Sequence, residues 1–274
     1  MAETIGACRD AGFPVYVLGE GSNVIVSDEG FRGLILRFSG ERIAIDGDQV
    51  EVETGATLQS LVIATIEAGL AGLHTLERIP GLVGGAVYGN AGAYGRQIDE
   101  IHVETRYFDG VEFQTRTDCE FDYRESVFKR HKDWIILSTR LHMERADANG
   151  LRAEAKRIRE IRDEKFPPTM RCAGSIFKNF FLNDLPENAA GLIPKAAVRG
   201  GKVASAYFLE RVGAKGMREG GIEIASYHAN LIYNAGCGTA AELRKLILEL
   251  KRRVREEFGF EVEEEVQYVG EFND

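Results

Sequence analysis

Three glycine-dense loops, each flanked by apolar residues, constrain this chain more than any other feature of its sequence. They are Leu18-Gly-Glu-Gly-Ser-Asn23, Ile79-Pro-Gly-Leu-Val-Gly-Gly-Ala86 and Asn90-Ala-Gly-Ala-Tyr-Gly95. Glycine loses more conformational entropy on folding than other residues, so it recurs at this density where the backbone takes a positive φ or approaches a ligand closely. Backbone N–H groups in such loops bind anions. The loops therefore predict a binding site for a phosphate-bearing cofactor.

Two common phosphate-binding folds do not fit these loops. The first loop lacks the third glycine of a dinucleotide fingerprint, and the residues after Asn23 predict a strand where a Rossmann unit has a helix. The P-loop pattern G-x-x-x-x-G-K-[ST] is absent from the sequence. Tight turns remain the alternative explanation for any one loop, but three loops in one half of the chain favour a ligand.

The charge balance limits the partners of the chain. Lys and Arg number 34 against 43 Asp and Glu, which gives a net charge of −9. Binding along a nucleic acid needs clustered cations, so we expect no nucleic-acid partner. An anionic ligand must then meet a local cationic pocket.

Cysteine usage and hydropathy indicate a cytoplasmic protein without a metal site. The cysteines are scattered and form no C-x-x-C pair, which favours a reducing compartment and predicts that they are buried small residues. We see no signal peptide and no apolar run near the ~20 residues that a membrane helix needs. We therefore expect no membrane association.

The patterning of the chain predicts an α+β fold with two domains. Short strands dominate the first half, and three longer helices are expected at residues 57–69, 150–165 and 239–258. Pro167 and Pro168 end the second of these helices, which places the domain boundary there. A last strand is predicted from Val262 to Val269. The predicted domains are residues 1–165 and 166–274.

Six motifs, in order along nearly the whole chain, resemble one enzyme family. They are Val17–Asp28, Ile79–Gly95, Phe121–Ser126 (FDYRES), Ala173–Asn179 (AGSIFKN), His228–Asn234 (HANLIYN) and Glu264–Gly270 (EEVQYVG). Together they resemble the signatures of the UDP-N-acetylenolpyruvoylglucosamine reductases (MurB). The resemblance implies that residues 1–165 form an FAD-binding domain of the vanillyl-alcohol-oxidase (PCMH) type. Residues 166–274 would form a smaller α+β substrate-binding domain.

The resemblance also implies a reaction. NADPH reduces FAD, and the reduced cofactor converts the small-molecule substrate UDP-N-acetylglucosamine enolpyruvate to UDP-N-acetylmuramate for peptidoglycan synthesis, with the protein acting as a monomer. Two alternatives stay open at this point. One is a non-catalytic flavin or UDP-sugar binding protein, and the other is an FAD oxidase of the vanillyl-alcohol type.

The resemblance implies that the glycine loops form the cofactor site. The residues implied to bind FAD are Gly19, Gly21, Ser22, Asn23, Pro80, Gly81, Gly84, Gly85, Asn90, Ala91 and Gly92.

The implied catalytic residues match the charge that the reaction develops. Hydride addition to an enolpyruvyl group leaves negative charge on the neighbouring carbon and its carboxylate, so a fixed cation and a proton donor are needed. The motifs imply Arg124 as the cation, Ser175 as the proton donor and Glu265 as the third active-site residue. The alternatives are a surface ion pair for Arg124, a turn or helix cap for Ser175, and a solvated strand end for Glu265.

Substrate contacts are implied in both predicted domains. They are Tyr123, Lys165, Lys178, Asn179 and His228. The lysines, together with Arg171, supply the cationic pocket that a diphosphate needs. His228 is equally well explained as a structural hydrogen-bonding residue.

The chain departs from the family pattern at several places. Glu20 stands where the first loop usually has glycine, and a carboxylate there weakens FAD binding unless it points to solvent. An insertion runs from about residue 180 to 202. The tyrosine-bearing lid segment between the arginine and serine motifs has no counterpart, which is typical of the shorter subtype. The usual N-terminal segment is missing ahead of Glu3, which predicts an edge strand at Val15–Leu18 without its partner.

Overall fold

The computed structural model describes residues 2–272, which form two compact units. The first unit comprises Met1–Glu20 and Arg32–Pro168, and the second comprises Gly21–Phe31 and Thr169–Asp274. The break at Pro168 lies close to the boundary expected from the proline pair. The segment Gly21–Phe31, which the sequence analysis assigned to the first domain, belongs to the second unit.

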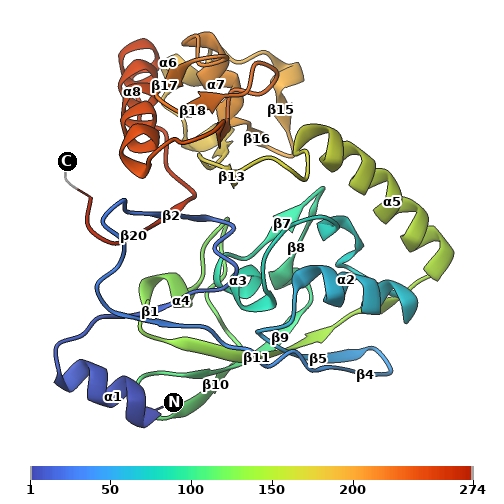
Figure 1. Ribbon diagram of the computed structural model, residues 1–274. Coiled ribbons are helices and arrows are strands. Elements are labelled where there is room, and N and C mark those ends of the chain that lie inside the picture. Colours follow the sequence, from blue (N-terminus) through green and yellow to red (C-terminus); the bar gives the residue numbers. More distant parts are fainter. Residues whose placement is uncertain (1, 273–274) are drawn as a thin grey trace. The chain divides into compact units, whose positions relative to one another are not determined.

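The first unit is a mixed layer of short helices on a sheet (Figure 1). Its elements are α1 (Ala2–Asp10), β1 (Val15–Val17), β3 (Leu34–Leu36), β4 (Ile43–Asp46), β5 (Gln49–Glu53), α2 (Leu58–Glu67), β6 (Leu70–Ala71), η1 (His74–Leu76), α3 (Val83–Tyr88), β7 (Gly92–Ala93), β8 (Arg96–Gln97), η2 (Ile98–Glu100), β9 (His102–Phe108), β10 (Phe113–Arg116), α4 (Val127–Arg130), β11 (Ile135–His142), β12 (Glu144–Arg145) and α5 (Ala148–Lys165).

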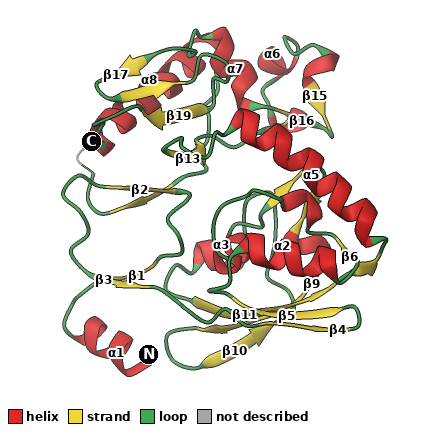
Figure 2. Cartoon of the chain, turned by 45° about the vertical axis from the view of Figure 1, so that its right-hand side comes forward, coloured by secondary structure: helices red, strands yellow, loops and turns green. Residues whose placement is uncertain are grey.

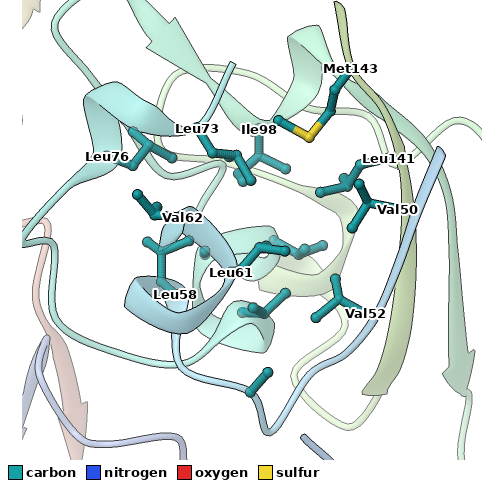
Figure 3. Packing of buried hydrophobic residues seen from close by; sticks show 14 of the residues in the cluster. Val50, Val52, Leu58, Leu61, Val62, Leu73, Leu76, Ile98, Leu141 and Met143 are labelled. Atoms are coloured by element: carbon teal, nitrogen blue, oxygen red, sulfur yellow. The ribbon is translucent and has the colours of Figure 1, made fainter. Parts of the chain in front are cut away.

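The main sheet of this unit has the strand order β10-β9-β11-β5-β4, and all its pairings are antiparallel. Helices α2 and α3 lie over one face of it (Figure 2). Val50 and Val52 alternate with the exposed Glu51 along β5, so the two valines face the helices. Leu61 of α2 packs toward them (Figure 3). The hydrophobic core of the unit lies between these two layers.

Local signals set the ends of α2 as predicted. The Thr57 side chain accepts the backbone N–H of Ser60 at 3.0 Å, which caps the first turn. The helix ends at Glu67, and Gly69 follows with φ at 67°. Only glycine takes this left-handed conformation without strain.

Strand β1 has a partner within the first unit. It pairs in parallel with β3, from Val15 opposite Leu34 to Val17 opposite Leu36. Ile5 of α1 is buried beside Val17 and Leu36 in a small hydrophobic cluster. Among the described residues β1 and β3 form a two-stranded sheet, so the pairing covers one edge of β1 and the strand remains an edge strand, as the sequence predicts.

The second unit combines several small sheets with one long helix. Its elements are β2 (Val24–Val26), β13 (Cys172–Ser175), β14 (Phe180–Phe181), η3 (Leu182–Asp184), α6 (Glu187–Ala190), η4 (Lys195–Ala197), β15 (Val198–Arg199), β16 (Lys202–Val203), α7 (Ser205–Arg211), β17 (Arg218–Glu219), β18 (Ile222–Ile224), β19 (Leu231–Asn234), α8 (Ala240–Phe258) and β20 (Gln267–Val269). The insertion forms the sheet β14-β16-β15, and its Leu185 and Ala189 are buried in the core of this unit.

Helix α8 is amphipathic, as its sequence predicts. Leu246, Ile247, Leu250 and Val254 are buried along one face. Gly259 ends the helix with φ at 74°.

The predicted strand from Val262 to Val269 is wrong as one continuous element. Glu264 forms an isolated antiparallel bridge with Phe177, whereas β20 begins only at Gln267 and pairs in parallel with β2. The chain changes partner at Val266, and a strand cannot keep one regular ladder across such a change.

The segment Gly21–Phe31 makes two sets of hydrogen bonds with the rest of the second unit. Strand β2 pairs with β20, with Val24 opposite Gln267 and Val26 opposite Val269. The Asp28 carboxylate accepts the backbone N–H groups of Ala240 and Ala241, at 2.8 and 2.9 Å, at the start of α8. Both pairings are long-range, which is why local patterns did not reveal them.

The prediction that the cysteines are buried holds for only part of the set. Cys119 is buried, and burial raises the pKa of its thiol to about 11. Cys8 and Cys172 are half-buried and Cys237 is exposed. Among residues 2–272, no helix is both long and apolar enough to cross a membrane.

The contact between Asp28 and α8 leads to a stability prediction. Asp28→Ala removes the acceptor for two N–H groups at the helix N-terminus, so we expect it to lower the free energy of unfolding by about 1 kcal/mol. Urea denaturation measures this loss. Glu29→Ala, at the neighbouring exposed acid, is the matched control, and equal midpoints for the two variants would contradict the contact.

Candidate active site

Arg124 lies in a strained turn of the first unit. Asp122 and Glu125 exchange backbone hydrogen bonds of 3.2 and 3.1 Å, which closes a tight turn around Tyr123 and Arg124. Arg124 has φ at 58°, a left-handed conformation that costs an L-residue with a Cβ about 1–2 kcal/mol. Such strain is typical of functional sites, where the surrounding structure holds the residue in place.

The turn directs the Arg124 guanidinium at the third glycine loop. Its Nη2 donates to the carbonyl of Gly92 at 2.8 Å, and its Nη1 lies 3.5 Å from the carbonyl of Asn90. The guanidinium carbon lies 5.2 Å from the centre of the Tyr123 ring, a cation–π distance. Lys129 donates from Nζ to the Arg124 carbonyl. These contacts build the Arg124 side chain and backbone into the first unit.

The third loop is organised by Asn90 and a short hairpin. The Asn90 side chain is fully buried, donates to the Asp122 carbonyl at 3.1 Å and accepts the Asp99 N–H at 3.1 Å. Strands β7 and β8 form the hairpin that follows, and a Cβ on Gly92 would lie 2.7 Å from the Arg96 carbonyl oxygen. The glycine at position 92 is thus required by the hairpin itself.

The second loop separates the roles of its adjacent glycines. A Cβ on Gly84 would lie 3.0 Å from the Cβ of Thr54, so this glycine allows α3 to pack closely against the end of β5. Gly85 is exposed, and no atom lies within 4 Å of the position that its Cβ would occupy. Gly81 has φ at 118°, which also requires glycine. Of the adjacent Gly84 and Gly85, Gly85 is the one that leaves an open backbone surface for a ligand.

Glu20 does not simply point to solvent. One of its carboxylate oxygens accepts the backbone N–H of Gly81 at 3.1 Å, so the first and second glycine loops meet through this side chain within the first unit. The departure from the family pattern therefore places a negative charge on an amide of the second loop.

Ser175 ends strand β13 immediately after a bulge in the second unit. The pairing of β13 with β19 shifts register between Cys172 and Ser175, and Gly174 takes φ at 77° within the shift. A bulge of this kind changes the direction of the following side chain. Ser175 is half-buried.

Asn230, which the sequence analysis did not single out, fastens the residues after Ser175. Its side chain is 3% exposed. It accepts the Phe177 N–H at 2.9 Å, donates to the Phe177 carbonyl at 2.8 Å and donates to the Ser205 hydroxyl at 2.7 Å. Its place in the His228-Ala-Asn230 motif is the sequence signal that could have identified this position.

The consecutive acids Glu263, Glu264 and Glu265 have different environments. Glu263 pairs with Nζ of Lys178, and Glu264 pairs with Nζ of Lys251 at 2.9 Å. The half-buried Glu265 donates its N–H to the Ile176 carbonyl at 2.7 Å, next to Ser175. The structure thus brings Glu265 and Ser175 onto neighbouring backbone segments.

The remaining substrate candidates are distributed over both units. Lys178 is 7% exposed, and Asn179 accepts the Ser205 N–H at 3.2 Å. The Asn230 N–H donates to Nδ1 of His228 at 3.3 Å, which assigns the ring hydrogen of a neutral His228 to Nε2. Lys165 ends α5 in the first unit, where burial and the neighbouring Arg162 lower the pKa of its amine. In the described part of the chain, no group of three or more His, Cys, Asp or Glu side chains is placed to hold a metal ion.

Family models match both halves of the chain. Residues 1–112 match the FAD binding domain, and residues 166–269 match the C-terminal domain of UDP-N-acetylenolpyruvoylglucosamine reductase.

Relatives with that enzyme name cover almost the whole chain. The UDP-N-acetylenolpyruvoylglucosamine reductase of Solibacter usitatus is 58% identical over 97% of this chain and 86% of its own length. The reductase of Rubrobacter xylanophilus is 36% identical over 99% of this chain and 86% of its length. A solved structure of the reductase from Thermus caldophilus is similar with a TM-score of 0.73 and 29% identity, covering 98% of this chain and 90% of that one.

The strain at Arg124 predicts an unusual order of stabilities. Arg124→Ala and Arg124→Gly both lose the guanidinium contacts, but only alanine keeps the Cβ that makes φ at 58° costly. We expect the glycine variant to be the more stable by about 1 kcal/mol in urea denaturation. The same pair of substitutions at Tyr123, in the same turn, is the control, and there glycine should be the less stable. Equal stabilities at position 124 would show that the turn is not strained.

Proposed function

This chain belongs to the UDP-N-acetylenolpyruvoylglucosamine reductase family and is an FAD-dependent oxidoreductase, and we propose that Arg124, Ser175 and Glu265 carry its reaction. The reaction is the NADPH-dependent reduction of UDP-N-acetylglucosamine enolpyruvate to UDP-N-acetylmuramate, a precursor of peptidoglycan. The observation that carries the proposal is the hydrogen bond from the Glu265 N–H to the Ile176 carbonyl, which joins two motifs that lie far apart in the sequence.

The glycine loops fit the cofactor. The exposed backbone at Gly85 has open space where a side chain would stand, so a flat or extended ligand can approach it. We propose that FAD is held by Gly19, Gly21 and Ser22 of the first loop, by Pro80, Gly81, Gly84 and Gly85 of the second, and by Asn90, Ala91 and Gly92 of the third. FAD, when bound, takes a hydride from NADPH and supplies it to the enolpyruvyl group.

Arg124 supplies the fixed positive charge. A guanidinium stays protonated throughout the working pH range and can hold a carboxylate through two parallel hydrogen bonds. Its contacts with the Gly92 and Asn90 carbonyls orient it before substrate arrives, so little reorganisation is needed as negative charge develops.

Ser175 donates the proton that the reduced substrate takes up, and Glu265 assists this transfer. A serine hydroxyl is a weak acid, but an enolate-like carbon is basic enough to take its proton when the two are held in contact. The bulge at Gly174 and the Asn230 hydrogen bonds fix the backbone on either side of Ser175. The Glu265 carboxyl group acts beside it, by polarising the developing intermediate or by relaying the proton.

The cationic residues hold the UDP part of the substrate. We propose Lys165 and Lys178 as contacts to the diphosphate, and Tyr123, Asn179 and His228 as hydrogen-bonding or stacking contacts.

A direct experiment separates this function from an oxidase. The purified protein should show flavin absorbance that NADPH bleaches, and the absorbance should return when UDP-N-acetylglucosamine enolpyruvate is added under anaerobic conditions. Recovery with oxygen alone and not with the UDP-sugar would indicate an oxidase. A protein that binds the UDP-sugar but never turns it over would indicate a binding protein.

Ser175→Ala tests the proton donor. Reduction by NADPH should stay near the wild-type rate, whereas the step that consumes the UDP-sugar should slow on the order of a hundredfold or more, because only that step needs the proton. Stopped-flow absorbance measures the two steps separately. Ser126→Ala is a control hydroxyl, since the Ser126 Oγ is bonded to the Tyr88 carbonyl in the first unit. Equal loss in both steps would rule out the proposed role.

Glu20→Gln should tighten FAD binding. The substitution keeps the size of the side chain but removes a negative charge from the Gly81 amide, where it repels an approaching diphosphate. We expect the Kd of the apoprotein for FAD to fall several-fold, with the gain shrinking at high salt. Fluorescence titration gives the Kd, and Glu29→Gln is the control for a general change in net charge. An unchanged Kd would mean that the cofactor does not meet this carboxylate.

Lys165 predicts a pH dependence of UDP binding. Burial and Arg162 lower the pKa of this amine, so its charge is fully present below that pKa and is lost as the pH rises through it. Affinity for UDP should therefore fall with rising pH at values below the ordinary lysine titration near about 10.4. Lys165→Arg stays charged and should keep its affinity over the same range. Calorimetric profiles that run parallel for the two proteins would contradict the contact.

A further inference from the structure

The Asn23 side chain makes a hydrogen bond within the protein that its expected role as a cofactor contact does not explain. It stands in the first glycine loop, where the family motif implies binding to FAD. In the structure its Nδ2 donates to the backbone carbonyl of Glu265 at 3.0 Å. Its own carbonyl accepts the Gln267 N–H at 3.0 Å. Both contacts lie within the second unit.

These bonds extend the pairing of β2 with β20 by one residue. The regular ladder begins with Val24 opposite Gln267, so Glu265 lies beyond its end. A side-chain amide replaces the backbone partner that the ladder no longer provides. This matters because the chain changes direction between the Glu264 bridge and β20.

The peptide groups on both sides of Glu265 are thereby held. Its N–H donates to the Ile176 carbonyl at 2.7 Å, beside Ser175, and its carbonyl accepts from Asn23. The other side-chain donor near this carbonyl, Nε2 of Gln267, lies 3.5 Å away, which is a weak contact. The direction of the Cα–Cβ bond of Glu265 follows from the two peptide planes that flank its Cα, so these bonds fix the point from which the side chain extends.

We infer that Asn23 is a positioning residue for Glu265. The bond from Asn23 links the end of the first glycine loop to the residue proposed to polarise the intermediate or relay the proton. The inference rests on the proposed role of Glu265. Misplacing a reacting group by about 1 Å slows a reaction by up to a hundredfold, so the loss of one orienting bond should be visible in the rate.

The test compares Asn23→Ala with Gln267→Ala. Both variants remove a side-chain amide near the Glu265 carbonyl, but only Asn23 makes a short bond to it. For each variant we would measure the Kd for FAD, the rate of reduction by NADPH and the rate at which the UDP-sugar reoxidises the protein. Asn23→Ala should slow the last step on the order of tenfold, per bound FAD, with the other two values close to those of Gln267→Ala.

A double-mutant cycle with Glu265→Gln makes the test specific. If Asn23 acts through Glu265, adding Asn23→Ala to Glu265→Gln should slow the reaction little further, and the two effects will not be additive. Additive effects would overturn the inference. So would an Asn23→Ala protein that loses FAD affinity while each bound FAD still turns over at the wild-type rate.

Two further variants distinguish a failure of the proposed role of Glu265 from a failure of the inference about Asn23. A wild-type rate in Glu265→Gln alone would refute the proposed role of Glu265, whatever Asn23 does. Asn23→Ser, which keeps a shorter donor, serves if the alanine variant does not fold. It should lie between wild type and Asn23→Ala in the substrate step, and a wild-type rate in Asn23→Ser would count against a need for the amide.

Discussion

The segment Gly21–Phe31 is anchored in the second unit by a contact between residues 212 positions apart, in which the Asp28 carboxylate accepts the first backbone N–H groups of α8. The neighbouring pairing of β2 with β20 holds the same segment from its other end. A helix N-terminus has unsatisfied donors and a positive end of its dipole, so a carboxylate there satisfies both needs. With the segment in place, Asn23 reaches the Glu265 carbonyl and Glu265 reaches the Ile176 carbonyl.

A different principle positions Arg124, the proposed catalytic cation, in the first unit. Arg124 takes a left-handed backbone conformation that glycine would adopt without cost, and the unit compensates with hydrogen bonds to its guanidinium and to its carbonyl. Stability alone would not select arginine at this position. The strained turn holds the guanidinium against the third glycine loop. We interpret this placement as serving the proposed reaction, because stability by itself would favour glycine at position 124.

Local chemistry was predictable wherever one segment contained the whole signal. The Thr57 cap, the Gly69 stop and the apolar face of α8 follow from neighbouring residues, and the structure confirms them. The final strand failed because its two parts pair with different partners, Phe177 and β2, which no local pattern records. The structural role of Asn230 was not predicted for the same reason, since its hydrogen bonds join residues more than twenty positions away.

The family, the FAD-binding class and the α+β composition can be read from the sequence, because ordered motifs and turn glycines are properties of short segments. The folded chain was needed to show that Gly21–Phe31 belongs to the second unit, that the Glu20 carboxylate accepts the Gly81 N–H and that the Asn23 side chain donates to the Glu265 carbonyl. Each of these depends on which distant backbone groups need a partner once the sheets and α8 have formed. Hydrogen-bond satisfaction is a property of the folded chain as a whole, and a local pattern does not contain it.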